Sequence, residues 1–517
     1  MISKVMIEKN AYHDSVTLMS LSGKVLGVEG VEEAVVSMAT GMNKELLDNI
    51  HLLTDEAKEA TENDLIIAVK AVSEEVLEET LQFIDDALNK KKSSKKSGQE
   101  QTAETLNKAL DYLPDANMAI ISVPGEYAAR EARLALNKGL HVMMFSDNVT
   151  IEDERKLKEL GREKGLLVMG PDCGTAMINQ TGLCFANNVK QGEIGLVAAS
   201  GTGLQEVAVQ IDRLGYGVSQ AIGTGGRDLH KDIGGIMMLE GLRALDADEQ
   251  TKVIALISKP PAKEVQDKIL EEVSKINKPV VVGFLDGDQV AVEQSGAVFA
   301  PTLIETARQA VKALDSSVTL DKEISETLVN YAQNEQASLQ DKQQYIRGLF
   351  CGGTLTSEAL SILRSEGLAV KSNVAKKAEE KLDNIHESVG HTLLDMGDDD
   401  FTKGKPHPMI EPSLRNDRIR EELLNEETAV LLLDFELGYG SHEDPVGESI
   451  ATLSETLSEL KNQGRHVSVI AYMCATKQDK QGYQNQVDRL SALGIYVAAS
   501  NEEASKLAAM ITSKEVK

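Results

Sequence analysis

Two glycine-threonine turns, 152 residues apart, constrain the fold of this chain more than any other feature. The first reads Ser200-Gly201-Thr202-Gly203 and the second Cys351-Gly352-Gly353-Thr354, and Glu206 and Glu358 follow them at matching positions. In each copy an apolar run, which we interpret as a buried strand, ends at small residues that open a helix. Free N–H groups at such a helix start can hold a phosphate or carboxylate, and glycine lets the backbone approach closely.

One such turn could equally be a tightly packed corner that binds nothing, but two copies favour a duplicated anion-binding domain. The predicted binding residues are Ser200, Gly201, Thr202, Gly203, Gly352, Gly353 and Thr354.

A length of 517 residues indicates three or four domains. Only 3% of the residues are aromatic and none is Trp, so the cores must be aliphatic, as suits parallel sheets covered by helices.

Charge and cysteine content exclude several function classes. The net charge of −28 makes nucleic acid and the membrane surface improbable partners. The four cysteines form no CxxC pair, which argues against a disulfide framework or a structural zinc site, and we expect no metal. The first residues are too charged for a signal peptide, and no apolar run approaches the roughly 20 residues of a membrane span. We therefore expect a cytoplasmic protein.

The pattern of apolar runs and helical segments predicts four α/β or α+β domains. Residues 1–90 form a small α+β domain of the ferredoxin-like type, with a strand at Ser15–Leu21, and a polar linker follows at 90–100. Residues 103–190 read as a Rossmann-like βαβαβ unit without a GxGxxG fingerprint. Two further α/β domains, each opening on a glycine-threonine turn, cover 191–315 and 343–517.

Asp172-Cys173-Gly174 follows a predicted strand end, where ligands bind in open parallel sheets. We include these three residues among the candidate substrate-binding residues, because their backbone could form a further anion nest. Cys173 could be a nucleophile, but no histidine stands near it in sequence to activate it. We expect a structural or site-lining cysteine.

A second glycine-rich loop, Gly223-Thr224-Gly225-Gly226, also follows a predicted strand and is a candidate phosphate-binding segment. Arg227, directly after it, offers a forked cation for phosphate or carboxylate and is our candidate catalytic cation. The matching place in the second copy is acidic, around Asp398, which fits a solvated loop better than a Mg²⁺ site. His442 is a candidate acid or base, although a hydrogen-bonded loop histidine is the simpler interpretation.

These motifs resemble a known family. Residues 103 to about 315 resemble the α subunit of succinyl-CoA synthetase through Gly170-Pro-Asp-Cys-Gly, the Gly195…Glu206 turn, Gly223-Thr-Gly-Gly and Lys278-Pro-Val-Val-Val-Gly-Phe. Residues 343–517 resemble the ligase-type domain of the partner subunit, and the whole chain resembles the FdrA proteins. The resemblance implies an α/β fold: a Rossmann-like CoA-binding-type domain and two flavodoxin-like succinyl-CoA-ligase-type domains, behind the small α+β domain.

One departure from the synthetases bears directly on function. Synthetases carry phosphate on a histidine shortly after the Lys-Pro-Val-Val-Gly strand, but residues 285–300 contain no histidine here, and no ATP-grasp domain is recognisable. The resemblance to FdrA implies a subunit of a multi-component oxamate carbamoyltransferase in purine (allantoin) catabolism, which exchanges carbamoyl phosphate and oxamate with oxalurate and phosphate. An acyl-CoA synthetase and a non-catalytic anion-binding scaffold remain as alternatives.

Carbamoyl transfer needs phosphate cradling and oxyanion stabilisation rather than a covalent nucleophile. The carbamoyltransferase interpretation therefore requires no cofactor, whereas the synthetase alternative requires CoA and ATP with Mg²⁺. The implied partners are the small anions carbamoyl phosphate, oxamate and phosphate, together with other protein subunits in a hetero-oligomer. No unambiguous acid, base or nucleophile stands out in the chain, which is the reason to expect contributions from partner subunits.

Overall fold

The computed structural model describes residues 2–93, 102–319, 325–402 and 405–513, apart from positions 10, 12, 14, 29, 51 and 62. Most of the linker predicted at 90–100 therefore lies outside the described residues. The chain divides into two compact units, Met1–Ala109 with Thr402–Pro406 and Leu110–Phe401 with His407–Lys517. None of the described helices is long and apolar enough to cross a membrane.

The first unit contains a three-stranded antiparallel sheet in the order β1-β3-β2, built from β1 (Ile2–Glu8), β2 (Val31–Met38) and β3 (Leu65–Ala71). Alternate residues of β3 enter two separate cores, Ile67 and Val69 on one face and Ile66 and Ala68 on the other. The helices are α1 (Ser15–Leu26), α2 (Gly41–Asn49), α3 (Asp55–Glu59) and α4 (Glu74–Ser93). Helices therefore cover both faces of this small sheet.

The strand predicted at Ser15–Leu21 is wrong, because this segment is the first part of α1. Its buried residues Leu18, Leu21 and Val25 are three and four positions apart, which is a helical spacing. The β-branched and apolar residues at its start conceal that period. The strand β1, whose side chains are mostly exposed, was not predicted.

The second unit begins with a short parallel sheet, in the order β4-β5-β6, that confirms the predicted βαβαβ unit. Its elements, after α5 (Leu106–Tyr112), are β4 (Met118–Ile121), α6 (Gly125–Asn137), β5 (His141–Met144), α7 (Ile151–Lys164) and β6 (Val168–Met169). A buried ion pair between Lys158 and Asp228 fastens α7 to the glycine loop that follows β10 in the next sheet, and Glu154 of the same helix also pairs with Lys158. The ammonium of Lys158 is fully buried between Glu154 and Asp228, 2.7 and 2.9 Å from their carboxylates.

A seven-stranded sheet follows in the order β13-β12-β11-β9-β10-β7-β8, parallel from β13 to β10. Its strands are β7 (Thr175–Ile178), β8 (Thr181–Cys184), β9 (Gln191–Ala198), β10 (Val218–Gly223), β11 (Val253–Ser258), β12 (Val280–Phe284) and β13 (Val298–Phe299). Its helices are α8 (Gly201–Arg213), α9 (Ile236–Ala247), α10 (Lys263–Val273), α11 (Gln289–Gln294) and α12 (Leu303–Leu314). Strands such as Val253–Ser258 are buried throughout, as expected of a parallel sheet covered on both faces.

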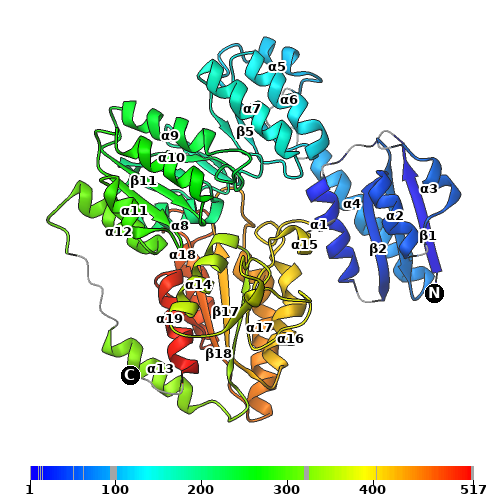
Figure 1. Ribbon diagram of the computed structural model, residues 1–517. Coiled ribbons are helices and arrows are strands. Elements are labelled where there is room, and N and C mark those ends of the chain that lie inside the picture. The colour runs from blue at the N-terminus through cyan, green and yellow to red at the C-terminus, as the bar shows by residue number, and fades with distance from the viewer. Residues whose placement is uncertain are drawn as a thin grey trace. The chain divides into compact units, whose positions relative to one another are not determined.

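After α13 (Glu326–Ala337), a six-stranded parallel sheet follows in the order β15-β16-β14-β17-β18-β19. Its strands β17 and β18 are labelled in Figure 1. Its strands are β14 (Tyr345–Phe350), β15 (Val370–Ser372), β16 (His391–Asp395), β17 (Thr428–Glu436), β18 (Ser468–Cys474) and β19 (Tyr496–Ala498). Its helices are α14 (Gly353–Ser365), α15 (Asp399–Thr402), α16 (Asn416–Leu424), α17 (Pro445–Asn462), α18 (Tyr483–Ala492) and α19 (Asn501–Thr512). The strand that leads into each turn, β9 or β14, is central in its sheet, so the sequence repeat is also a structural repeat.

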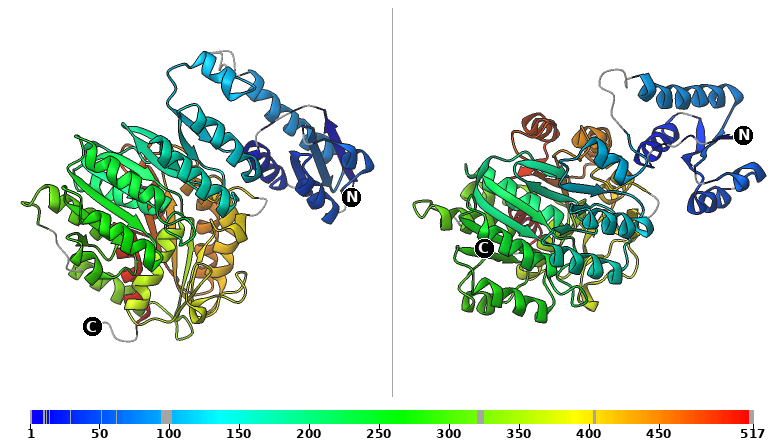
Figure 2. Two further views of the ribbon diagram at one scale, coloured as in Figure 1. Left: turned by 45° about the horizontal axis from the view of Figure 1, so that its top comes forward. Right: turned by 90° about the horizontal axis from the view of Figure 1, so that it is seen from above.

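The two repeated sheets share one hydrophobic core, to which Leu204 and Val207 of α8 and Leu355 and Ala359 of α14 contribute. In Figure 2, helices flank the strands of the sheets in both views. The buried glutamates of the repeat lie at this junction. Glu206 bonds to the hydroxyl of Tyr472 in the second copy, and Glu358 accepts the N–H of Leu303 at the start of α12 in the first, at 2.6 Å.

We expect the buried carboxyl of Glu358 to make stability depend on pH. Burial, with the nearby carboxyl of Glu206 as the next cause, raises its pKa from 4.5 to about 8. Between these values the folded state keeps a proton that the unfolded state loses, so the free energy of unfolding falls as pH rises, by up to about 1.4 kcal/mol per pH unit. Glu358→Gln lacks this contribution.

Urea unfolding of both proteins at pH 5 and pH 8 measures the effect. The variant should gain stability relative to the wild type on going from pH 5 to pH 8. An equal difference at the two pH values would show that Glu358 is ionised in the folded protein.

Candidate active site

The starts of α8 and α14 meet at a single place. Ser200 caps α8, because its Oγ accepts the N–H of Gly203 at 2.9 Å, and the same Oγ lies 2.6 Å from Oγ1 of Thr354. The N–H of Thr354 in turn donates to Oγ1 of Thr202 at 3.4 Å. The two turns, which the sequence presents as separate binding segments, therefore form one structure, which we call the paired frame: Ser200–Gly203 together with Gly352–Thr354.

The paired frame is suited to an anion. Each helix start carries a partial positive charge of about half a unit, so two of them at one place favour a phosphate or carboxylate. No side chain caps α14, whose N-cap residue is Gly352. The small residue Gly201 also lets the segment around Thr175 lie close to the turn. Thr175 Oγ1 lies 3.7 Å from the position that a Cβ on Gly201 would take.

Lys259 and Asp395 adjoin the second turn. A Cβ on Gly353 would lie 3.2 Å from Lys259 Nζ and would collide with Asp395 Oδ2. Lys259 follows the end of β11, and Asp395 ends β16, where Asn373 hydrogen-bonds both its N–H and its C=O. The frame is therefore flanked by a cation and a carboxyl group from two different sheets.

The carboxyl group of Asp395 is suited to proton transfer. Burial raises its pKa from 3.8 to about 7, while Lys259 acts in the opposite direction and Asp398 adds to the increase. Its Oδ1 accepts the N–H of Gly397 at 3.0 Å, which leaves Oδ2 directed toward Gly353. A base works best when its pKa lies near the working pH, so Asp395 can accept a proton near neutrality.

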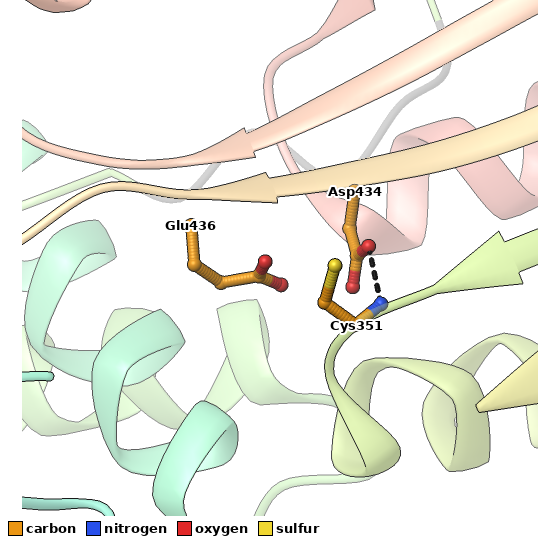
Figure 3. Close-up of side chains that lie close together, drawn as sticks. All are labelled: Cys351, Asp434 and Glu436. Atoms are coloured by element: carbon orange, nitrogen blue, oxygen red, sulfur yellow. Dashed lines mark hydrogen bonds between the residues drawn. The ribbon is translucent and has the colours of Figure 1, made fainter. Parts of the chain in front are cut away.

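One thiol and two carboxyl groups lie close together beside Gly352 (Figure 3). They belong to Cys351, Asp434 and Glu436. Asp434 has three partners: it accepts the N–H groups of Cys351 and Gly352 at 2.7 and 2.9 Å and pairs with the buried guanidinium of Arg415 at 3.0 Å. Burial raises the pKa of Glu436 well above its usual range, with the nearby Asp434 as the next cause. Burial likewise raises the pKa of the Cys351 thiol.

The two predicted glycine loops pack against each other beside the paired frame. A Cβ on Gly223 would lie 2.6 Å from the Cys173 sulfur, and one on Gly225 would collide with the carbonyl of Pro171. Gly174 approaches Gly201, and the carboxylate of Asp172 lies near Gly226. These glycines are therefore needed for close backbone packing, and desolvation beside Asp147 and Asp399 raises the pKa of Asp172 to about 6.

Cys173 and Thr224 are occupied by structural interactions. The Cys173 thiol is buried, which raises its pKa to about 12, and it points to the carbonyl of Thr175 at 3.6 Å. A thiol with that pKa stays protonated at neutral pH and is a poor nucleophile. Thr224 is fully buried, and its N–H and hydroxyl both donate to the carbonyl of Ala198.

The two candidate catalytic residues are held by partners outside the frame. Arg227 donates to the carbonyl of Val149 at 2.7 Å and pairs with the buried Glu154 at 2.9 Å. The Nδ1 atom of His442 accepts the N–H of Asp444 at 3.1 Å, and its Nε2 lies 3.9 Å from Glu448. Both side chains thus hold local structure, and neither makes a contact with the residues of the paired frame.

Sequence reasoning did not indicate Lys259, and it noted the acidic segments at 394–400 and 434–445 without naming Asp395 or Glu436 as site residues. Each of these three residues stands at or just beyond the carboxyl end of a parallel strand, which is the position where ligands bind in such sheets. A charged residue that ends an apolar run, as in Ile257-Ser258-Lys259 or Leu393-Leu394-Asp395, was the available signal. Nothing in the sequence indicated that these strand ends belong to one site.

Models of known families match three segments of the chain. A model described as "AllF, heavy metal-associated domain" matches residues 1–105, one for a CoA binding domain matches 189–285, and one for CoA-ligase matches 349–511. The CoA binding match falls mainly on the residues that the sequence indicated as the first ligase-type domain, 191–315.

Individual relatives agree with these matches. YahF of Escherichia coli strain K12, described as an uncharacterized protein, is 47% identical over 506 residues, which are 98% of each chain. The succinate–CoA ligase [ADP-forming] subunit alpha 2 of Archaeoglobus fulgidus is 29% identical over 209 residues, or 39% of this chain and 71% of that subunit. Among solved structures, PH0766 from Pyrococcus horikoshii OT3 covers 77% of this chain and 84% of its own at 15% identity and a TM-score of 0.31.

Proposed function

The chain belongs to the FdrA-like family that includes YahF and is related to the succinyl-CoA synthetases, and we propose that it transfers the acyl group of an acyl phosphate to a small acceptor. The observation that carries this proposal is the convergence of two helix starts and Lys259 at one place. Such an arrangement binds phosphoryl oxygens and stabilises a departing phosphate.

In the reaction that this arrangement supports, the acyl group passes directly from the acyl phosphate to the acceptor. The acceptor attacks the carbonyl carbon of the acyl phosphate, and the bond from that carbon to the bridging oxygen breaks. The electron pair leaves with the phosphate, whose negative charge Lys259 and the N–H groups of Gly201, Thr202 and Gly353 stabilise, since those of Gly203, Gly352 and Thr354 already have acceptors. Asp395 takes the proton that the acceptor loses. No covalent enzyme intermediate is needed, because the frame holds both reactants close together.

The segment in which a synthetase carries its relay histidine supports a direct transfer without a phosphoenzyme. Residues 285–300 lack histidine, and Asp286 in this stretch is instead bound to the second copy, 3.0 Å from Arg364 of α14 and bonded to Ser361. The loop therefore serves as a structural link where a synthetase would carry phosphate. Incubation with radiolabelled ATP should leave no acid-labile label on the chain, whereas stoichiometric label on a histidine would restore the synthetase relay.

The first candidate acceptor is the thiol of CoA, which would make the enzyme an acyl-CoA ligase of the synthetase type. The matches to CoA-ligase and CoA binding domains favour it. When bound, CoA would supply a sulfur nucleophile. The residues described here fit its reaction partner, since Ser200–Gly203 and Gly352–Thr354 would hold the phosphate of the acyl phosphate and Asp395 would take the thiol proton.

The second candidate is carbamoyl transfer from carbamoyl phosphate to oxamate, which yields oxalurate and phosphate. Two observations favour it: the missing relay histidine, and a base beside the frame. The amide nitrogen of oxamate is a weak nucleophile that must lose a proton, and Asp395 with a pKa of about 7 can accept it near neutral pH. The oxamate carboxylate is a second anion, which Lys259 can pair with.

We also propose that the chain works with partner subunits. Several apolar side chains of the β4–α6 region are exposed, among them Leu113 at 65% and Ile120 at 56%. Exposed apolar side chains that gather in one region are typical of protein interfaces. Full turnover by the purified chain alone would contradict an obligate complex.

One assay distinguishes the candidate reactions. Phosphate release is measured with carbamoyl phosphate or succinyl phosphate as donor and with oxamate or CoA as acceptor, using the chain alone and with its co-purifying proteins. Release that depends on oxamate and carbamoyl phosphate supports carbamoyl transfer, and release that depends on CoA supports the ligase. No acceptor-dependent release from either donor, even with the partner proteins present, would leave a non-catalytic anion-binding scaffold.

A further inference from the structure

Three potential metal ligands are buried together beside Gly352. The sulfur of Cys351 and one carboxylate oxygen each of Asp434 and Glu436 lie within 4.8 Å of one another. Figure 3 shows that the two acidic side chains come from the same strand, β17, and that the carboxyl group of Glu436 is directed toward the end of β14, where Cys351 lies. Atoms at such separations can surround one small cation.

The buried carboxylate of Glu436, which lacks a hydrogen-bond donor, distinguishes this cluster from a set of paired acids. Its side chain is only 2% exposed, and no N–H or O–H donor among the described residues reaches its carboxylate oxygens, so the carboxyl of Asp434 is the neighbour with which it can share a proton. Asp434, by contrast, accepts two backbone N–H groups and pairs with Arg415. A buried polar group without partners is costly, so Glu436 requires either a proton or a ligand.

We propose that Cys351, Asp434 and Glu436 bind one divalent transition-metal ion of the zinc type. A thiolate with two carboxylates suits Zn²⁺ or Co²⁺ and does not suit Mg²⁺ or Ca²⁺, which prefer oxygen ligands alone. Three protein ligands leave one coordination position for another group, as is usual where zinc is not purely structural.

The local charges are balanced when the ion is bound. The metal and Arg415 supply three positive charges, and the thiolate with the two carboxylates supplies three negative ones. The start of α14 adds about half a positive charge, which opposes the cation but is much smaller than the charge of the three ligands. The N–H groups of Cys351 and Gly352 already donate to Asp434, so they do not point at the proposed ion.

The proposed metal site borders the paired frame. Oxygens of Asp434 and Glu436 each lie 3.2 Å from the position that a Cβ on Gly352 would take, and the methyl group of Thr202 lies 3.0 Å from it. A bound ion would thus stand beside the place assigned to the acyl phosphate. The proposed metal site depends only on its three ligands. Its test therefore does not depend on whether the proposed transfer reaction is correct.

The experiment titrates the metal-free full-length chain with Zn²⁺ in competition with a chromophoric chelator, and with Co²⁺ while the absorption spectrum is recorded. We expect one Zn²⁺ per chain and a thiolate-to-cobalt charge-transfer band in the near ultraviolet. Cys351→Ser should lose the band and bind Zn²⁺ roughly a hundredfold more weakly or worse. Glu436→Gln, which keeps the side-chain shape, should weaken binding while retaining the band at high Co²⁺.

The control is Cys184→Ser, because Cys184 is a half-buried cysteine outside the cluster. Its Zn²⁺ affinity and cobalt spectrum should match those of the wild type. Circular dichroism confirms that each variant is folded. The proposal is overturned if the wild type binds no Zn²⁺ in competition with the chelator, which would mean that Glu436 is simply protonated. It is also overturned if Cys351→Ser retains wild-type affinity and spectrum.

Discussion

Replacement of Asp395 by asparagine should lower the rate of acyl transfer by roughly 10²- to 10⁴-fold, the usual contribution of a positioned base. The carboxyl group is fully buried beside Gly353 and Lys259, and asparagine keeps its shape but cannot accept the proton of the acceptor. The matched control is Asp400→Asn, which changes an exposed acid of α15, shortly after the same strand, and should leave turnover near the wild-type value. Equal losses in both variants would mean that the loop, and not a base at position 395, matters.

The pH profile separates a base from a structural role for Asp395. Burial raises its pKa to about 7, so the ionised form that accepts a proton predominates only above that pH. The wild-type kcat/KM should therefore rise with pH through about 7 and then level off. Asp395→Asn should show a residual rate without this rise. A wild-type rate that is flat between pH 5.5 and 8.5, or an unchanged rise in the variant, would show that another group takes the proton.

Gly353→Val should lower turnover by about 10²- to 10³-fold and abolish phosphate binding. The new Cβ would collide with Asp395 Oδ2 and lie 3.2 Å from Lys259 Nζ, so the side chain would occupy the space where the frame meets these two groups. Loss of one oxyanion-stabilising donor has an effect of this size in other enzymes. Isothermal titration with inorganic phosphate measures binding directly.

Gly23→Val is the control for the general effect of adding this side chain, because no atom lies within 4 Å of the Cβ position there. It should bind phosphate as the wild type does. Unaltered phosphate affinity in Gly353→Val would remove the second turn from the site, and the first turn would then have to act alone.

The sequence predicted most elements of the two repeated sheets because each strand is an uninterrupted aliphatic run, such as Val253–Ser258. The prediction of two anion-binding turns came from a repeat that is visible in sequence. That the turns face each other could not be predicted, because the contact between Ser200 and Thr354 depends on how two separate sheets pack.

The same physical reason explains the missed and misjudged side chains. Lys259 and Asp395 come from different sheets and become neighbours only at the junction of the two copies. Arg227 has the chemistry of an anion-binding residue, but Glu154 of α7 is its partner, and this pairing depends on the packing of α7 against the glycine loop. In the first unit, the helix α1 was mistaken for a strand because its apolar residues are also β-branched in part.

The central claim is that two helix starts form one anion site, and the most direct test is a crystal structure of the full chain with selenate, an oxyanion with anomalous scattering. We expect one anomalous peak in contact with both Ser200–Gly203 and Gly352–Thr354, with Lys259 Nζ within ion-pair distance. A peak held by one turn alone, or no peak at the junction while selenate binds elsewhere, would contradict the shared site and the transfer reaction proposed for it.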